Sequence, residues 1–159
     1  MTDLKVEFWD RMTDVRSGML GIMGQGRLVA MSPRIDADLP GGIWFITANA
    51  TELGKAVTSG PQAAQLVVVD DSAGLYADVE GILTHSTDPK ALDEIWSFAA
   101  EAWFDKGKTD PDVCLMRFAP STAEISITPK SGVKFLYEMA KAKISGTEPD
   151  VGAQGTVVF

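Results

Sequence analysis

The sequence has few of the residues from which thiol and metal sites are built. Its 159 residues include one cysteine, Cys114, and one histidine, His85. A single cysteine excludes an intramolecular disulfide and every cysteine-rich zinc pattern. Cys114 lies in an apolar stretch, where a buried thiol behaves as a small hydrophobic side chain, and His85 ends a predicted strand, where a solvated or capping role is usual. We therefore expect no metal site and no reactive thiol.

Positive charge is also scarce. The chain has 14 lysines and arginines against 22 aspartates and glutamates, a formal net charge of −8. A phosphate backbone would be repelled by such a chain unless the basic residues were clustered, and no cluster is visible. We expect no binding to nucleic acid, although these charge counts still allow a local positive pocket that binds one small anion.

Long hydrophobic runs are missing as well. No apolar run approaches 18 residues and no charged-then-apolar leader opens the chain, so we expect no signal peptide, no membrane span and a location in the cytoplasm. The apolar share of 45% and the charged share of 23% are ordinary for a globular protein. The length suits a single domain over residues 1–159.

Short apolar runs of strand length fill most of the chain. Turn formers such as Gly24-Gln25-Gly26 and Pro40-Gly41-Gly42 separate them. The predicted strands cover residues 19–23, 27–31, 43–47, 66–69, 75–83, 113–118 and 124–128. Several connections are too short for parallel crossovers, so the spacing predicts a mainly antiparallel barrel or sandwich.

Helical periodicity interrupts this pattern at four places. Leu4, Phe8, Met12, Val15 and Met19 recur at helical spacing and predict an amphipathic helix that ends near residues 16–18. Further helices are predicted over residues 51–59, 89 to about 103, and 131–144, the last with its C-cap at Ser145-Gly146. The tail is predicted to end in an edge strand at residues 156–159.

Few groups in the sequence could carry catalysis. Asp70-Asp71 and Asp110-Pro111-Asp112 occupy turn positions, where aspartate favours local hydrogen bonds to the backbone. An outward-facing arginine, Arg27, a threonine ending the next strand, Thr47, and the N-terminus of a short helix that carries Lys55 could converge on a phosphate. A surface arginine beside an ordinary capped helix is the alternative interpretation, and it stays open.

A series of motifs in the second half of the chain matches a known family in order and spacing. The sequence resembles the general stress protein branch of the pyridoxamine 5′-phosphate oxidase-like flavin-binding split barrels. The matching residues are Ile95-Trp96, Ala102-Trp103-Phe104, Gly107-Lys108, Asp110-Pro111-Asp112, Leu115-Met116-Arg117-Phe118-Ala119-Pro120 and Ala123-Glu124.

The resemblance implies a mainly β fold with peripheral helices: a six-stranded antiparallel split barrel with Greek-key order. It also implies a homodimer that binds flavin mononucleotide (FMN) at the subunit boundary. Such a protein would be an oxidoreductase acting on a small molecule that the sequence does not identify, and the flavin would supply the redox chemistry. The alternative is a split-barrel dimer that has lost FMN and serves as a non-catalytic binding or structural module.

The resemblance also implies a set of cofactor-binding residues. Arg27 takes the place of the arginine in the family's Arg-x-Val strand, and Trp44, Phe45 and Ile46 would lie along the ring. Thr47 and Thr51 match a threonine and a serine near the phosphate, and Trp103 would close the site. Lys55 takes the place of the phosphate-binding lysine if two residues are inserted; without the insertion that position falls on Leu53.

Two further positions depart from the pattern of this branch. Its Arg-Pro-Met is here Val29-Ala30-Met31, and Ser126 stands where a tryptophan is usual. With Leu53, these departures favour the alternative in which FMN has been lost.

Overall fold

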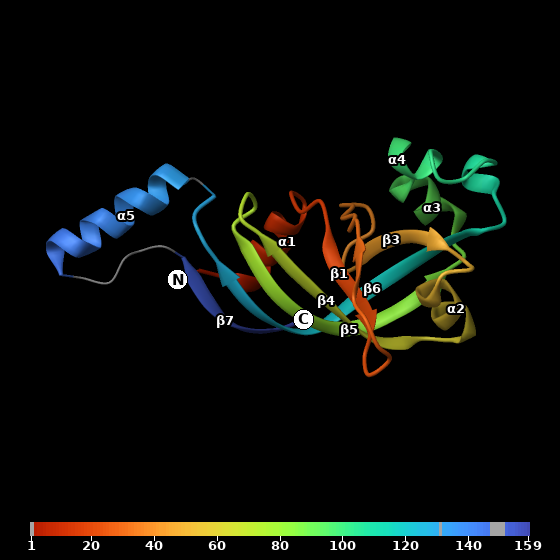
Figure 1. The fold of residues 1–159 in the computed structure, drawn as a ribbon, viewed down its shortest axis with the longest axis horizontal. Helices are drawn as coiled ribbons and strands as arrows, with labels where there is room; N and C mark the ends of the chain where they lie inside the picture. The colour runs from red at the N-terminus through yellow and green to blue at the C-terminus, as the bar shows by residue number, and fades with distance from the viewer. Residues whose placement is uncertain (1, 131, 147–151) are drawn as a thin grey trace.

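One antiparallel sheet organises the fold. The computed structural model describes residues 2–130, 132–146 and 152–159, and Figure 1 shows the sheet curling until it nearly closes into a barrel. The strand order is β2-β1-β4-β5-β6-β3, with β7 added on β6. The strands are β1 (Gly18–Ile22), β2 (Val29–Met31), β3 (Ile43–Ala48), β4 (Gln62–Asp70), β5 (Leu75–Ser86), β6 (Val113–Ile127) and β7 (Ala153–Val158). The mainly β, six-stranded antiparallel barrel predicted from the sequence is confirmed.

The barrel is joined at one point between its two edge strands. Arg34, shortly after β2, exchanges two backbone hydrogen bonds with Trp44 in β3, at 2.8 and 2.9 Å. Among the described residues, this isolated bridge pairs the β2 edge of the sheet with β3. Past the bridge the edges separate, and the end of β3 is left beside β2 with a split between them.

The described residues form six helical segments, of which all but the last lie around the sheet. They are α1 (Leu4–Met12), α2 (Glu52–Ser59), α3 (Pro89–Ile95), α4 (Phe98–Glu101), the 3-10 turn η1 (Gly107–Thr109) and α5 (Gly132–Ser145). Asp3, Thr51 and Asp88 cap the first three helices with side-chain oxygens, as helix N-termini require. Among the described residues no helix is long and apolar enough to cross a membrane.

The predicted N-terminal helix is too long by about one turn. The helix ends at Met12, where the Thr13 hydroxyl donates to the carbonyl oxygen of Asp10 at 2.6 Å. Val15 nevertheless joins the buried core, and Met19 lies in β1 with 41% of its surface exposed. The helical spacing of these two residues is therefore coincidental, and the N-terminal segment turns back onto the barrel before residue 16.

Two other elements differ from the predictions because of single residues. The helix predicted from residue 89 to 103 divides into α3 and α4, because Trp96 has an extended backbone and Ser97 caps the second piece through Ala100 N at 3.2 Å. The two strands predicted in residues 113–128 are one strand, β6. Pro120 lies opposite Gly81 at a register shift between Glu80 and Gly81, so the strand continues past the proline.

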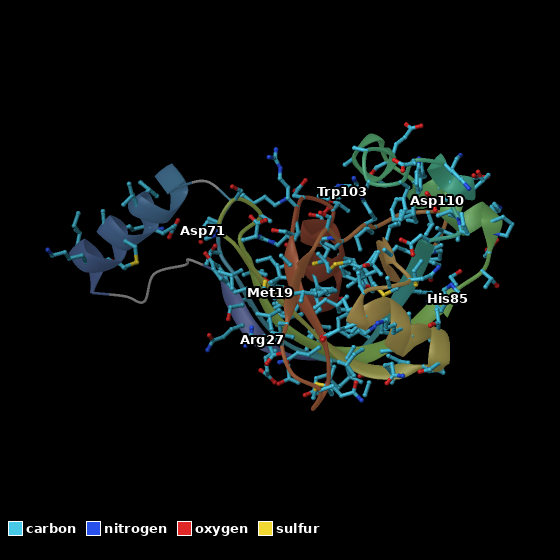
Figure 2. All side chains as sticks on the ribbon, turned by 45° about the vertical axis from the view of Figure 1, so that its right-hand side comes forward. Met19, Arg27, Asp71, His85, Trp103 and Asp110 are labelled. Carbon is cyan, nitrogen blue, oxygen red and sulfur yellow. The ribbon has the colours of Figure 1, made fainter. Side chains whose placement is uncertain are left out.

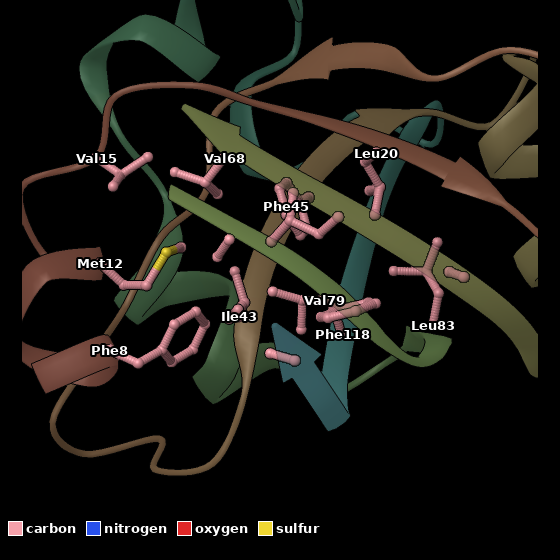
Figure 3. Close-up of a cluster of buried hydrophobic side chains, with 14 of the residues drawn as sticks. Phe8, Met12, Val15, Leu20, Ile43, Phe45, Val68, Val79, Leu83 and Phe118 are labelled. Atoms are coloured by element: carbon pink, nitrogen blue, oxygen red, sulfur yellow. The ribbon is translucent and has the colours of Figure 1, made fainter. Parts of the chain in front are cut away.

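The core fills the barrel interior and extends under α1. Figure 3 shows Phe45 of β3, Val79 and Leu83 of β5, and Phe118 of β6 packed together, with Phe8 of α1 closing one end. The last residue of the chain seals the same end, because the rings of Phe159 and Phe8 meet edge to face at 5.1 Å.

Candidate functional site

A groove runs along the split in the barrel. Two adjoining hollows, of about 470 and 700 Å³, share four lining residues, so we treat them as one and call it the split groove. The shared residues come from β2, the end of β3 and the start of α2: Ala30, Met31, Thr47 and Thr51. Each hollow alone has the volume of a typical ligand site in a protein.

One end of the groove has an excess of positive charge. Arg27, from the β1–β2 connection, and Lys55, from α2, are both exposed and line it together with Glu52. Thr47 and Thr51 place their hydroxyl oxygens 3.1 Å apart. The N-terminus of α2 opens here, where backbone N–H groups and the helix dipole favour an anion. We call this the basic end.

A close contact between α2 and β3 fixes the geometry of the basic end. The Thr51 hydroxyl accepts from Gly54 N at 3.1 Å and donates to the carbonyl oxygen of Ala48 at 2.8 Å. A Cβ on Gly54 would lie 2.3 Å from that same oxygen, so only glycine allows α2 to pack so near the end of β3. Leu53 and Val57 anchor the helix in the core, and Leu53 also lines the groove beside the exposed side chain of Lys55.

The opposite end of the groove is mainly apolar. Ile46, Ile95, Ala100 and Phe104 line it, and Trp103 stands at its margin with 84% of its surface exposed. Two charged residues, Arg34 and Asp112, also contribute to the lining. We call this the apolar end. Figure 2 shows Arg27 and Trp103 well apart, as expected for residues at the two ends of one groove.

Trp103 is held at the groove by the turn that follows it. The ring of Phe104, next in the chain, is buried and lies 6.0 Å from the ring of Trp96. Asp110 accepts from the backbone N of Asp112 at 3.0 Å and from that of Lys106 at 3.3 Å, so its predicted turn role is confirmed. A buried neighbour and an ordered turn thus leave an exposed indole beside the groove.

The predicted cofactor-binding residues divide into two groups. Six of them line the groove: Arg27, Ile46, Thr47, Thr51, Lys55 and Trp103. Phe45 is fully buried in the barrel core, and Trp44 packs on the outer face of β3 against Ile95 and Leu115. Their side chains therefore lie outside the groove lining, although their strand forms one wall of the split.

Several lining residues could not be predicted from the sequence. Arg34 and Ser32 follow a short edge strand, and Ser97 was expected in the middle of a helix, where it would have no reason to face a ligand. Asp112 was expected only to order a turn, yet it also lines the apolar end. A different feature lies outside the groove: Trp44 Nε1 is buried and has no hydrogen-bond partner among the described residues.

The cysteine, the histidine and a group of three carboxylates lie away from the groove. The side chain of Cys114 is fully buried, and burial raises the pKa of its thiol to about 11, which opposes formation of a nucleophilic thiolate. His85 is exposed on β5. Three carboxylates, those of Asp36, Asp38 and Glu94, place ligand atoms within 4.8 Å of one another, but the Asp36 carboxylate already accepts from Asp38 N at 2.8 Å.

Comparisons with known proteins agree with this architecture. The model of the family described as "Pyridoxamine 5′-phosphate oxidase like" matches residues 3–150. A crystal structure from Jannaschia sp. CCS1, named as general stress protein 26, is 62% identical and superposes with a TM-score of 0.94 over 100% of both chains. No curated protein matches the chain significantly.

Two structures from Xanthomonas are more distant relatives. A general stress family protein from Xanthomonas campestris pv. campestris is 29% identical, with a TM-score of 0.70 over 82% of this chain and 93% of its own. A protein named general stress FMN/FAD binding protein, from Xanthomonas citri, is also 29% identical, with a TM-score of 0.68 over 79% of this chain and 89% of its own.

Proposed function

The chain belongs to the pyridoxamine 5′-phosphate oxidase-like family, in its general stress protein branch, and from that premise we propose that it binds FMN in the split groove. The observation that carries the proposal is the contrast between the two ends of the groove. FMN has a flat, largely apolar ring system at one end and a dianionic phosphate at the other. A groove with a basic end and an apolar end fits a ligand of that shape and charge.

The basic end has the groups that a phosphate needs. Arg27 and Lys55 supply two positive charges against the single carboxylate of Glu52. The Thr47 hydroxyl and the N-terminus of α2 supply further donors. Both basic residues belong to a chain with a net charge of −8, so their presence at the same end of one groove argues for an anionic ligand.

The apolar end has the groups that a ring system needs. Ile46 and Trp103 offer one aliphatic and one aromatic surface, and the exposed indole can cover a flat ligand that enters beside it. A bound flavin supplies hydride and electron transfer itself, so the protein has to hold it, exclude water and admit a small substrate. We therefore propose a flavin-dependent oxidoreductase that acts on a small molecule.

The proposal includes a cytoplasmic homodimer. A tryptophan with 84% of its surface exposed is unusual in a monomer, and burial of such a side chain is typical of the centre of a protein interface. We propose that a second copy covers the margin of the groove near Trp103.

A titration with FMN tests the proposed cofactor directly. The purified protein is expected to absorb at about 450 nm, or to take up added FMN with loss of the fluorescence of the free flavin. If no yellow species forms and added flavin keeps its full fluorescence at micromolar protein, the chain does not bind FMN.

Two residues favour the alternative, a split barrel that binds another small anion or a larger cofactor. Leu53 is buried and Val29 is uncharged, so neither can contribute the positive charge expected by direct alignment with the family. Retained affinity for inorganic phosphate or a nucleotide, in a protein that fails the FMN titration, would select this second function.

A further inference from the structure

Helix α5 stands apart from the barrel. Figure 1 shows it projecting beyond the end of the sheet that carries β7, away from α2, α3 and α4. It has 14 residues and ends at Gly146, whose φ of 70° and hydrogen bond to the carbonyl oxygen of Ala142 at 2.9 Å are typical of a helix C-terminus. Isolated helices of fewer than about 12 to 15 residues are marginal in water, so α5 needs a packing partner to be stable.

The helix carries an apolar stripe whose side chains are exposed to solvent. Leu136, Ala140 and Ile144 are spaced four residues apart, and Tyr137 lies beside them on the same side of the helix. Leu136 is 68% exposed, Tyr137 is 63% exposed and Ile144 is 88% exposed. Three large side chains in one row, all open to solvent, are typical of an interaction surface rather than of an isolated exposed residue.

The charge of the helix is opposite to that of the remaining chain. Within α5 there are three lysines, Lys134, Lys141 and Lys143, and one acid, Glu138, a formal +2. The other residues then include 11 basic and 21 acidic side chains, a formal −10. Helical spacing places Lys141 and Lys143 on opposite sides of the apolar stripe, so positive charges flank it.

We propose that α5 is an exchanged arm, which docks through its apolar stripe on the barrel of a second copy of this chain. The acidic barrel of that copy offers the complementary charge for the flanking lysines. Two arms would repel each other, because both carry +2, so the arm packs on the barrel and not on the other arm. An anionic membrane is a poorer partner, because a body with −10 would be held beside a surface of the same sign.

The fold of a close relative supports an arm that stands away from its own barrel. The Jannaschia crystal structure superposes over the full length of both chains with a TM-score of 0.94. The 14 residues of α5 are almost a tenth of this chain, so a helix folded back elsewhere would lower the score. The projecting position is thus shared with a protein that was observed in a crystal.

Cross-linking between isotope-labelled copies tests the exchange. Copies labelled with nitrogen-14 and nitrogen-15 are mixed until native mass spectrometry shows dimers of mixed mass, and a carbodiimide then joins lysines to nearby carboxylates. We expect peptides containing Lys141 or Lys143 to be linked to barrel peptides of the other isotope. Arm links confined to one isotope would mean that α5 folds onto its own barrel, and an absence of dimers would mean that no second copy binds; either result overturns the proposal.

Substitutions in the stripe test its energetic role. The double variant Leu136→Asp with Ile144→Asp should raise the dimer dissociation constant, measured by sedimentation equilibrium, by about tenfold or more, because two apolar anchors are lost. Met139→Asp is the control, since Met139 is 43% exposed on the same helix and lies outside the apolar stripe. Equal dissociation constants for the two variants would contradict the proposal.

Vesicles rich in phosphatidylglycerol test the alternative partner of α5, an anionic lipid surface. If the wild-type chain stays monomeric and sediments with the vesicles, while the double variant does not, α5 binds a lipid surface and the exchange is wrong. None of these results depends on flavin, so they can fail while FMN binding holds, and the reverse is equally possible.

Discussion

Replacing Lys55 by alanine should weaken the binding of FMN but not that of riboflavin, which lacks the phosphate. Lys55 faces the basic end of the groove, whereas its neighbour Leu53 is buried in the core. A charge-assisted hydrogen bond contributes about 1.5 to 3 kcal/mol. Lys55 is exposed, which weakens its electrostatics, so we expect the lower value and a loss of about tenfold in affinity for FMN.

The riboflavin measurement makes this prediction specific. Alanine at an exposed helical position does not disturb the helix, so the affinity for riboflavin should change by less than about twofold. Fluorescence titration of both ligands with the wild-type protein, Lys55→Ala and Lys90→Ala completes the test. Lys90 is an exposed lysine outside the groove lining, and its replacement makes the same change in net charge. Equal losses for FMN and riboflavin, or equal losses in the two variants, would refute a phosphate contact by Lys55.

Three other perturbations give distinct outcomes. Trp103→Ala should change the free energy of unfolding by no more than about 0.5 kcal/mol, because the side chain is 84% exposed. The same variant should lower the affinity for FMN and the affinity for riboflavin by the same factor, about tenfold. A loss of affinity for FMN alone would contradict stacking of Trp103 on the ring. Gly54→Ala should destabilise the fold by about 1 to 3 kcal/mol or more in urea denaturation, because its Cβ would lie 2.3 Å from the carbonyl oxygen of Ala48; an unchanged midpoint would show that α2 does not pack so closely. Cys114 should resist iodoacetamide at pH 8 until the protein is unfolded, since burial raises its pKa from 9.0 to about 11, and equal alkylation rates with and without urea would contradict its burial. The same shift favours the neutral thiol in the fold, so its contribution to stability is present below pH 9.0 and is lost as the pH rises to about 11.

The strands could be predicted from the sequence because their signals are local. Short apolar runs between turns, with the edge strand predicted at residues 156–159, located all seven strands of the described residues at least in part, and Thr51 marked the start of α2. Local signals failed where a distant residue decides the structure. Pro120 suggested a break, but its partner Gly81 on β5 accepts the register shift, and β6 runs through. Val15 and Met19 continued a helical pattern in the sequence, but Val15 is buried in the core after the helix has ended, and Met19 lies in β1.

The candidate site was predictable at one end and less so at the other. Thr51 and Lys55 lie in one short helix, so that their spacing already brought them together, and Arg27 follows a turn. Leu53 and Lys55 both line the groove, but Leu53 is buried and Lys55 is exposed; which residues of α2 pack on the core is not revealed by a single sequence. Trp44 and Phe45 were grouped with Ile46 by adjacency. Alternation along the strand sends Phe45 to the opposite face, whereas Trp44 shares the face of Ile46 but is buried against Ile95 and Leu115.

A crystal structure of the protein grown with FMN tests the central claim most directly. The claim predicts density in the split groove, with the phosphate between Arg27 and Lys55 and the ring beside Ile46 and Trp103. Flavin bound outside the groove, or bound with its ring at the basic end, would contradict the account.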